Sequence, residues 1–189
     1  MTSLFLVFGT QGAGKTTVLK GAKGAKVISI GTEMLNVYSR LTGTKDRDEV
    51  RKLGVLDVKH DAEIRNGILM KISRMKGTIA LDTHASLKTG DGYYSGFSFA
   101  DLDMLKSITK AIIYVDAPTK QIIARRKRDK SRRREADSAD EIEMHRRMNL
   151  SFTTIYAMRL QAPIFIVQND DGGLVAAQKR VVEIIEKAK

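Results

Sequence analysis

The chain has 189 residues, carries a formal net charge of +11 and contains no cysteine. This length fits a single domain over residues 1–189, built around one core. The absence of cysteine excludes disulfides, thiolate catalysis and cysteine-ligated zinc, so we expect no zinc and a cytoplasmic protein. No apolar run approaches the ~20 residues that span a bilayer, and the N-terminus lacks signal-peptide features, so we expect no membrane partner.

Short apolar runs predict buried strands at five places, and longer amphipathic segments predict helices between them. The predicted strands are 4–8, 26–30, 78–81, 111–115 and 164–167. Helical periodicity covers 55–75, 140–160 and 174–188. This alternation predicts the α/β class, with a parallel sheet of about five strands that helices cover on both faces. Ligands of such sheets bind beyond the carboxyl ends of the strands.

The segment directly after the first predicted strand, GTQGAGKT, matches the phosphate-loop pattern G-x-x-x-x-G-K-[ST] in full. Its glycines let successive backbone N–H groups converge on phosphate oxygens, and the following helix adds its positive dipole end. Lys15 supplies a mobile charge at the β- and γ-phosphates. The predicted ATP-binding residues here are Gly9, Thr10, Gln11, Gly12, Ala13, Gly14, Lys15, Thr16 and Thr17. The motif alone does not separate kinases from ATPases or GTPases.

Asp82 follows the predicted strand 78–81. An acid in this place in a phosphate-loop protein is the usual partner of Mg²⁺, directly or through water. The alternative is an aspartate that only caps the loop. Thr16 offers a hydroxyl to the same ion, so we expect Mg²⁺ with ATP, held by Thr16 and Asp82. His84 lies two residues further on and either contacts a substrate or orders the loop.

Residues 125–134 read RRKRDKSRRR, with eight basic residues and one acidic residue. Such a local excess of charge suits an anionic partner. Arg125, Arg128 and Arg132 have the spacing i, i+3, i+7, so a helix would place them on one face. Convergent guanidinium groups stabilise the charge of a phosphoryl-transfer transition state. A solvated face or an RNA-binding stripe is the alternative, although the run contains no aromatic residue to stack on bases.

A second arginine pair, Arg47 and Arg51, follows a capping-box pattern that begins at Asp46. A helix starting there would place both arginines on one face, because they are four residues apart. They would suit a second phosphate group beside the phosphate loop. The alternative is a solvated helix face.

With these residues assembled, the chain resembles the archaeal-type adenylate kinases, a family of P-loop nucleoside monophosphate kinases. The resemblance runs from end to end and combines the phosphate loop with DRDEVRKL at 46–53 and DTHA at 82–85. It also includes IGTEM, KTGDGYYSG, R-x-x-x-D-x-x-R-x-R, MN and VQN, at 30–34, 88–96, 125–134, 148–149 and 167–169. The resemblance implies a P-loop kinase three-layer sandwich with a short helical lid.

The resemblance also implies an activity, which is reversible, Mg²⁺-dependent transfer of the γ-phosphoryl group of ATP to AMP, giving two ADP. The AMP-side region would be about 31–76 and the lid about 125–140. The implied catalytic residues are Lys15, Arg51, Arg125, Arg132 and Arg134, and the implied AMP-binding residues are Gly31, Thr32, Arg47, Arg51 and His84. Asn169 would lie near the ATP base, and the family implies a homotrimer. A CMP or UMP kinase, or a P-loop ATPase acting with RNA, is the alternative function.

Overall fold

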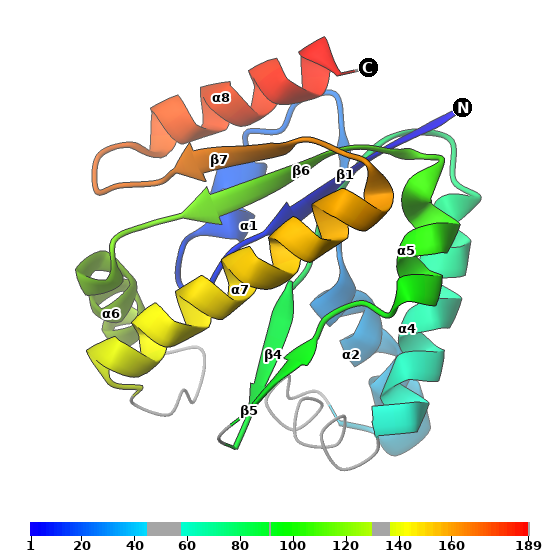
Figure 1. The fold of residues 1–189 in the computed structure, drawn as a ribbon, viewed down its shortest axis with the longest axis horizontal. Coiled ribbons are helices and arrows are strands. Elements are labelled where there is room, and N and C mark those ends of the chain that lie inside the picture. The colour runs from blue at the N-terminus through cyan, green and yellow to red at the C-terminus, as the bar shows by residue number, and fades with distance from the viewer. Residues whose placement is uncertain (45–57, 91, 130–136, 189) are drawn as a thin grey trace.

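The structure is a computed structural model that describes residues 1–44, 58–90, 92–129 and 137–188. Its centre is a sheet of five parallel strands in the order β2-β3-β1-β6-β7 (Figure 1). The strands are β1 (Thr2–Phe8), β2 (Lys26–Ser29), β3 (Gly77–Asp82), β6 (Thr109–Asp116) and β7 (Ile164–Gln168). These are the five predicted strands, so the predicted α/β class and parallel sheet are confirmed.

Helices cover both faces of this sheet (Figure 1). One face carries α1 (Lys15–Leu19) and α8 (Leu174–Lys187), and the other carries α2 (Ile30–Thr42), α4 (Val58–Ser73), α5 (Phe99–Lys106) and α7 (Ala139–Leu160). β1 serves both cores, since successive side chains of a strand point to opposite faces: Phe5 and Val7 join the first core, and Leu4 and Leu6 the second. None of the described helices has the length and apolar character needed to cross a bilayer.

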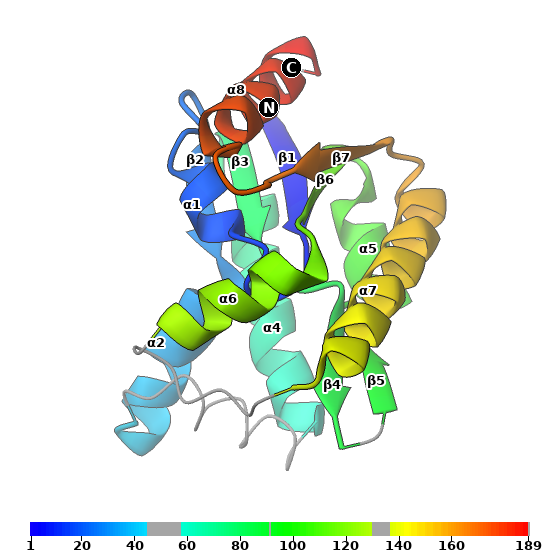
Figure 2. The same ribbon diagram turned by 90° about the vertical axis from the view of Figure 1, so that its left-hand side faces the viewer.

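Figure 2 looks onto the carboxyl ends of the strands, where α6 (Thr119–Arg128) crosses the end of the sheet. Ile122 anchors this helix, because it is fully buried in a small cluster with Ala13, Ala117 and Ile142. The cluster holds α6 and the start of α7 against the segment that follows β1. The predicted phosphate loop and the start of the predicted lid therefore meet at one end of the sheet.

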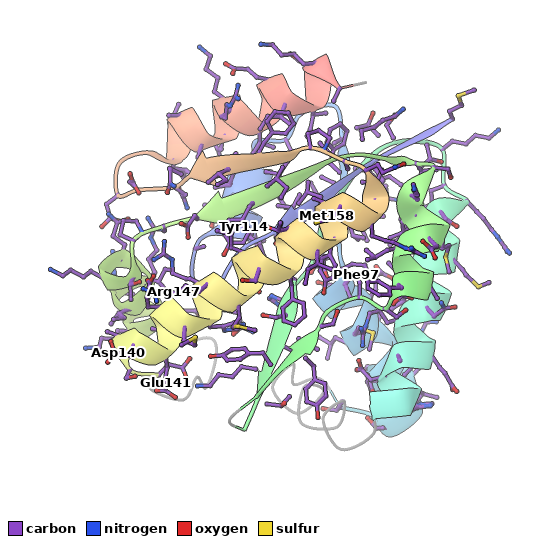
Figure 3. The ribbon with its side chains drawn as sticks, in the orientation of Figure 1. Phe97, Tyr114, Asp140, Glu141, Arg147 and Met158 are labelled. Atoms are coloured by element: carbon purple, nitrogen blue, oxygen red, sulfur yellow. The ribbon has the colours of Figure 1, made fainter. Side chains whose placement is uncertain are left out.

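An antiparallel hairpin that the sequence analysis did not predict lies between β3 and α5 (Figure 1). It consists of β4 (Ser86–Thr89) and β5 (Gly92–Ser95). The hydroxyl of Tyr156 on α7 closes its base by donating to the Ala85 carbonyl at 2.7 Å and accepting from the Gly96 N–H at 2.9 Å. Phe97 (Figure 3) packs edge-on against the Tyr156 ring. These contacts attach the hairpin to α7.

Candidate active site

The segment that joins β1 to α1 has the backbone of a phosphate loop. Gly9, Gly12 and Gly14 have φ values of +144°, +95° and +92°, in a region that other residues rarely adopt. Space imposes the same restriction, because a Cβ on Gly9 would overlap the Val115 carbonyl oxygen and one on Gly14 would overlap the Asn169 amide nitrogen. The glycines therefore meet a steric requirement of the turn, in which backbone N–H groups can line an anion site.

Lys15 begins α1 and lies inside this turn, with 7% of its surface exposed. Its Nζ donates to the Gly9 carbonyl at 2.8 Å. The N–H groups of Thr17 and Val18 donate to the Gly14 carbonyl at 3.0 and 2.9 Å, so the helix starts directly at the end of the loop. A cationic group within the loop, next to the N-terminus of a helix, suits a polyphosphate.

Thr16 and Asp82 meet across the end of the sheet. The register of β1 and β3 places Val7 opposite Asp82, so the residues that follow the two strands lie side by side. The Thr16 hydroxyl donates to Asp82 Oδ2 at 3.1 Å. A hydroxyl and a carboxylate are oxygen ligands of the kind Mg²⁺ prefers. The pair therefore fits the predicted metal.

This pair needs outside ligands to complete a Mg²⁺ site. Within the described part of the chain, no three His, Asp or Glu side chains are grouped so that they could hold a metal ion. That agrees with the usual coordination of Mg²⁺ in kinases, which takes one or two protein oxygens and completes its shell with water and substrate phosphate.

Two arginines of α6 hold the loop from the outside. Arg125 Nη1 donates to the Ala13 carbonyl at 3.3 Å, and its Nη2 forms an ion pair with Asp171 at 3.0 Å. Arg126 Nε donates to the Gln11 carbonyl at 2.9 Å. The predicted lid residue Arg125 thus lies at the phosphate loop. The sequence did not distinguish Arg126 from the other members of the basic run. Its place in the last turn of α6 turns its side chain toward the loop.

Asn169 lies directly after β7 and is 5% exposed. Its Nδ2 donates to the Ala13 carbonyl at 2.7 Å, and its backbone N–H donates to the Asp116 carbonyl at 2.8 Å. Its own carbonyl accepts from Arg125 Nη2 at 2.7 Å. Asn169 is therefore next to the loop and helps to fix the backbone before Gly14. Its contact with the ATP base stays a prediction.

Asp137, which sequence reasoning missed, joins α6 to the hairpin. Its carboxylate accepts from Arg126 Nη1 at 2.6 Å and from Lys88 Nζ at 3.2 Å. Burial alone would raise the pKa of Asp137, but these two hydrogen bonds hold it below its ordinary value. Lys88 also donates to Glu141 (Figure 3) at 2.7 Å, and this bond is the main cause that lowers the pKa of Glu141 to about 2. No local pattern in the sequence signals these pairs.

A second ion pair fixes α7 behind the loop. Arg146 Nε and Nη2 donate to the two carboxylate oxygens of Asp116 at 3.1 and 2.6 Å. Asp116 is the last residue of β6 and half-buried, so this bidentate pair ties α7 to the strand end next to the loop. Tyr114 (Figure 3) adds a further bond between β6 and α7 by donating to the Arg146 carbonyl at 3.2 Å.

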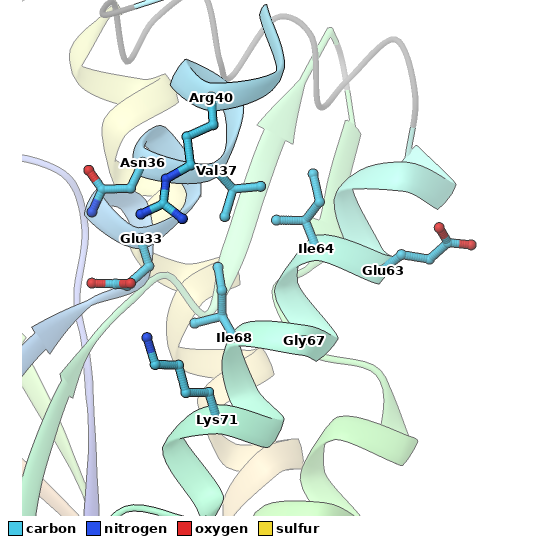
Figure 4. A pocket seen from close by; sticks show the side chains of 9 residues that line it. All are labelled: Glu33, Asn36, Val37, Arg40, Glu63, Ile64, Gly67, Ile68 and Lys71. Atoms are coloured by element: carbon cyan, nitrogen blue, oxygen red, sulfur yellow. The ribbon is translucent and has the colours of Figure 1, made fainter.

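The predicted acceptor side lies on α2 and beyond β3. Gly31 and Thr32 belong to the first turn of α2, and His84 is half-buried two residues beyond Asp82. A pocket of about 300 Å³ opens between α2 and α4 (Figure 4). It is lined by Glu33, Asn36, Val37, Arg40, Glu63, Ile64, Gly67, Ile68 and Lys71. The pocket falls within the predicted region 31–76, but none of the predicted AMP contacts that the structure describes, Gly31, Thr32 and His84, lines it.

Four predicted site residues, Arg47, Arg51, Arg132 and Arg134, lie outside the described residues. Their roles stay predictions. The structure brings the donor-side residues together around the loop, from the ends of β1, β3, β6 and β7 and from α6. This is the end of a parallel sheet at which ligands bind.

Comparisons with known proteins agree with this geometry. A family model described as an AAA domain matches residues 8–143, which include the phosphate loop and Asp82. The adenylate kinase of Pyrococcus horikoshii is 33% identical over 196 residues, covering 100% of this chain and 97% of the relative. The adenylate kinases of Pyrococcus abyssi and Thermoplasma acidophilum are 32% and 31% identical, covering 100% and 95% of this chain and 97% of each relative.

Solved structures show the same fold at lower identity. Shikimate kinases from Acinetobacter baumannii and Bacteroides thetaiotaomicron have TM-scores of 0.59 and 0.58 to this chain, with 18% and 14% sequence identity. The two alignments cover 99% and 97% of this chain and 95% and 98% of those chains. The phosphate loop, the parallel sheet and the full-length relatives lead to one assignment: the chain belongs to the archaeal-type adenylate kinase family of P-loop nucleoside monophosphate kinases.

Proposed function

We propose that this protein is an adenylate kinase, which transfers the γ-phosphoryl group of ATP to AMP reversibly and with Mg²⁺, giving two ADP. The observation that carries the proposal is the phosphate loop together with Thr16 and Asp82, whose Oγ1 and Oδ2 atoms lie 3.1 Å apart at the end of the sheet where ligands of such folds bind. The full-length relatives named adenylate kinase support the choice of acceptor. We extend the proposal to a cytoplasmic location, expected from the absence of cysteine, and to a homotrimer, which the resemblance implies.

On the donor side, the chain supplies orientation and charge rather than a covalent nucleophile. The loop N–H groups and Lys15 would hold the β- and γ-phosphates of ATP. To do so, the Lys15 amine would exchange its bond to the Gly9 carbonyl for phosphate oxygens. Thr16 and Asp82 would hold Mg²⁺. When bound, this ion neutralises charge that builds up on the phosphate oxygens during transfer.

On the acceptor side, catalysis depends on alignment of the AMP phosphate with the γ-phosphorus. Arg47 and Arg51 would bind that phosphate, while Gly31, Thr32 and His84 would border the nucleotide. Convergent arginines from the lid, Arg125, Arg132 and Arg134, would cover the transferred group and exclude water, which otherwise competes as acceptor. Only Arg125 of these lies in the described part of the chain, where it is next to the loop.

The proposal is tested by measuring ADP formation from ATP and Mg²⁺ with AMP, CMP, UMP or GMP as acceptor, and with none. We expect ADP only with AMP, at about two ADP per ATP consumed. A Lys15→Ala variant is the matched control, because it loses the loop charge and should lose most turnover with every acceptor. Preference for CMP or UMP would keep the fold and the donor site but replace the acceptor.

ADP formed equally without an acceptor would replace the proposal with an ATPase. The basic run 125–134 would then become the first candidate for an RNA contact, since it carries eight basic residues. Stimulation of ATP hydrolysis by RNA, weakening steeply as salt increases, would identify that function.

A further inference from the structure

Asn149, near the middle of α7, is 1% exposed, and its side-chain amide bonds to two distant segments. Its Oδ1 accepts from the Ser86 N–H and from the Ser86 hydroxyl, each at 3.0 Å. Its Nδ2 donates to the Thr10 hydroxyl at 3.3 Å. The Ser86 N–H can only donate, so it determines which end of the amide is the oxygen. Ser86 is 1% and Thr10 0% exposed, so the whole bridge is shielded from solvent.

The two partners of Asn149 belong to the two halves of the site. Thr10 is the second residue of the phosphate loop, and its carbonyl accepts from the Ala13 N–H at 3.0 Å. Ser86 begins the hairpin and comes two residues after His84, which is proposed to border the acceptor. Asn149 therefore joins the phosphate loop, proposed to hold the donor, to the segment directly after His84, proposed to border the acceptor.

This bridge differs from the direct contact between the same two halves. The direct contact is the 3.1 Å hydrogen bond from Thr16 to Asp82, and both of these oxygens would turn to Mg²⁺ in the proposed reaction. The bonds of Asn149 use neither proposed metal ligand. Arg146 lies on the same helix about one turn before Asn149, and its bidentate ion pair with Asp116 at the end of β6 also holds this part of α7 in place. If Thr16 and Asp82 turned to Mg²⁺, the direct contact would break, whereas the bonds of Asn149 would not be required to change.

We propose that Asn149 is a positioning residue that sets the separation between the phosphate loop and the acceptor-side segment. It touches no substrate and acts through Thr10 and Ser86. The inference rests on the proposed function and deepens it, because an acceptor oxygen must lie in line with the γ-phosphorus. A displacement of about 1 Å between reacting groups costs up to about a hundredfold in rate. Removal of the bridge should therefore act on kcat and leave the binding of each nucleotide nearly unchanged.

The test compares Asn149→Ala with Thr153→Ala. Thr153 lies one turn further along α7, is fully buried, and donates only within the helix, to the Asn149 carbonyl at 2.7 Å. Both variants lose buried hydrogen bonding, but only Asn149→Ala breaks the bridge. We expect Asn149→Ala to lower kcat by about ten- to a hundredfold, with each KM changed less than about threefold. Thr153→Ala should change kcat less than about twofold despite a comparable loss of thermal stability.

Ser86→Ala is a second variant, for use if Asn149→Ala does not fold. It removes only one hydroxyl, so we expect it to keep the fold. Ser86→Ala should also lower kcat, but by a smaller factor than Asn149→Ala. The kcat of the double variant Asn149→Ala/Ser86→Ala should be no lower than that of Asn149→Ala alone, because both substitutions act through one bridge. Equal kcat in Asn149→Ala and Thr153→Ala would overturn the proposal, as would a rise in the KM for ATP with kcat unchanged. The acceptor panel on the unmodified protein decides the proposed function separately, and the variants are compared with whichever acceptor it accepts.

Discussion

Replacement of Gly14 by alanine tests whether the steric fit of the phosphate loop creates the nucleotide site. Gly14 has a φ of +92°, and an L residue in the left-handed region costs about 1–2 kcal/mol. The new Cβ would also overlap the Asn169 amide nitrogen, which donates to the Ala13 carbonyl at 2.7 Å. Loss of that buried bond adds about 1–3 kcal/mol. Gly14→Ala should therefore destabilise the protein by about 2–5 kcal/mol in total.

Gly77 offers a matched control. Its φ of +96° is close to that of Gly14, but nothing lies within 4 Å of its Cβ position. It begins β3, at the end of the sheet opposite the site. Gly77→Ala should lower the free energy of unfolding only by the conformational cost, about 1–2 kcal/mol. In a chain of this size, each kcal/mol of lost stability lowers Tm by about 2–4 °C. Its turnover should match that of the unmodified protein.

Thermal unfolding and titration with a non-hydrolysable ATP analogue distinguish the two variants. We expect Gly14→Ala to show the larger drop in Tm and to bind the analogue at least about tenfold more weakly, because displacement of Asn169 and the Ala13 carbonyl reorients the loop N–H groups. If both variants lost the same Tm and kept the same affinity, the contact between Gly14 and Asn169 would have no part in forming the site. The double variant Gly14→Ala/Asn169→Ala should recover part of the loss, since the overlap is gone.

Three further predictions test separate parts of the molecule. Asp82→Asn should raise the Mg²⁺ concentration needed for half-maximal rate by about tenfold, measured as initial rate against Mg²⁺, because a neutral amide holds the ion less strongly. Arg51→Ala should raise the KM for AMP and leave that for ATP unchanged, and an unchanged AMP dependence would contradict its assignment to the acceptor phosphate. Burial lowers the pKa of His145 to about 4, so the unfolded chain takes up a proton between about pH 6.5 and 4 that the folded protein does not. The free energy of unfolding, measured with urea, should therefore fall by about 2–3 kcal/mol through His145 between about pH 7 and pH 4.5. In His145→Asn this contribution to the pH dependence should disappear.

The central sheet could be predicted because its strands are continuous apolar runs. Leu4 to Phe8 is buried on both faces, and this produces a pattern that polar or amphipathic segments do not share. The prediction failed where one element follows another without a break: the strand predicted to reach Ile30 ends at Ser29, and α2 begins at once. Helix α5 has only eight residues, yet Ser98 and Asp101 form a capping box whose spacing is visible in the sequence and could have located it.

The site divides in the same way between local and distant contacts. Gly9, Gly14 and Lys15 could be assigned because their roles depend on the backbone of one short segment. Arg126 contacts Gln11 across 115 residues, and Asn149 contacts Thr10 across 139 residues. Such pairs follow from the order of the strands and the paths of α6 and α7, and no sequence spacing encodes them. The sequence therefore predicted which segment forms the phosphate loop and left open what holds that loop in place.

This division also bears on the choice of acceptor. Shikimate kinases have the same fold, so the fold alone does not determine which molecule receives the phosphoryl group. The proposed donor site is built from backbone groups, Lys15, Thr16 and Asp82, and these groups would suit ATP whatever the acceptor is. In the proposed reaction, selectivity for the acceptor would come from the predicted region 31–76 and from the segment that Asn149 bonds through Ser86. ATP binding alone cannot test it, and variants of the acceptor side are informative only when each monophosphate is assayed in turn.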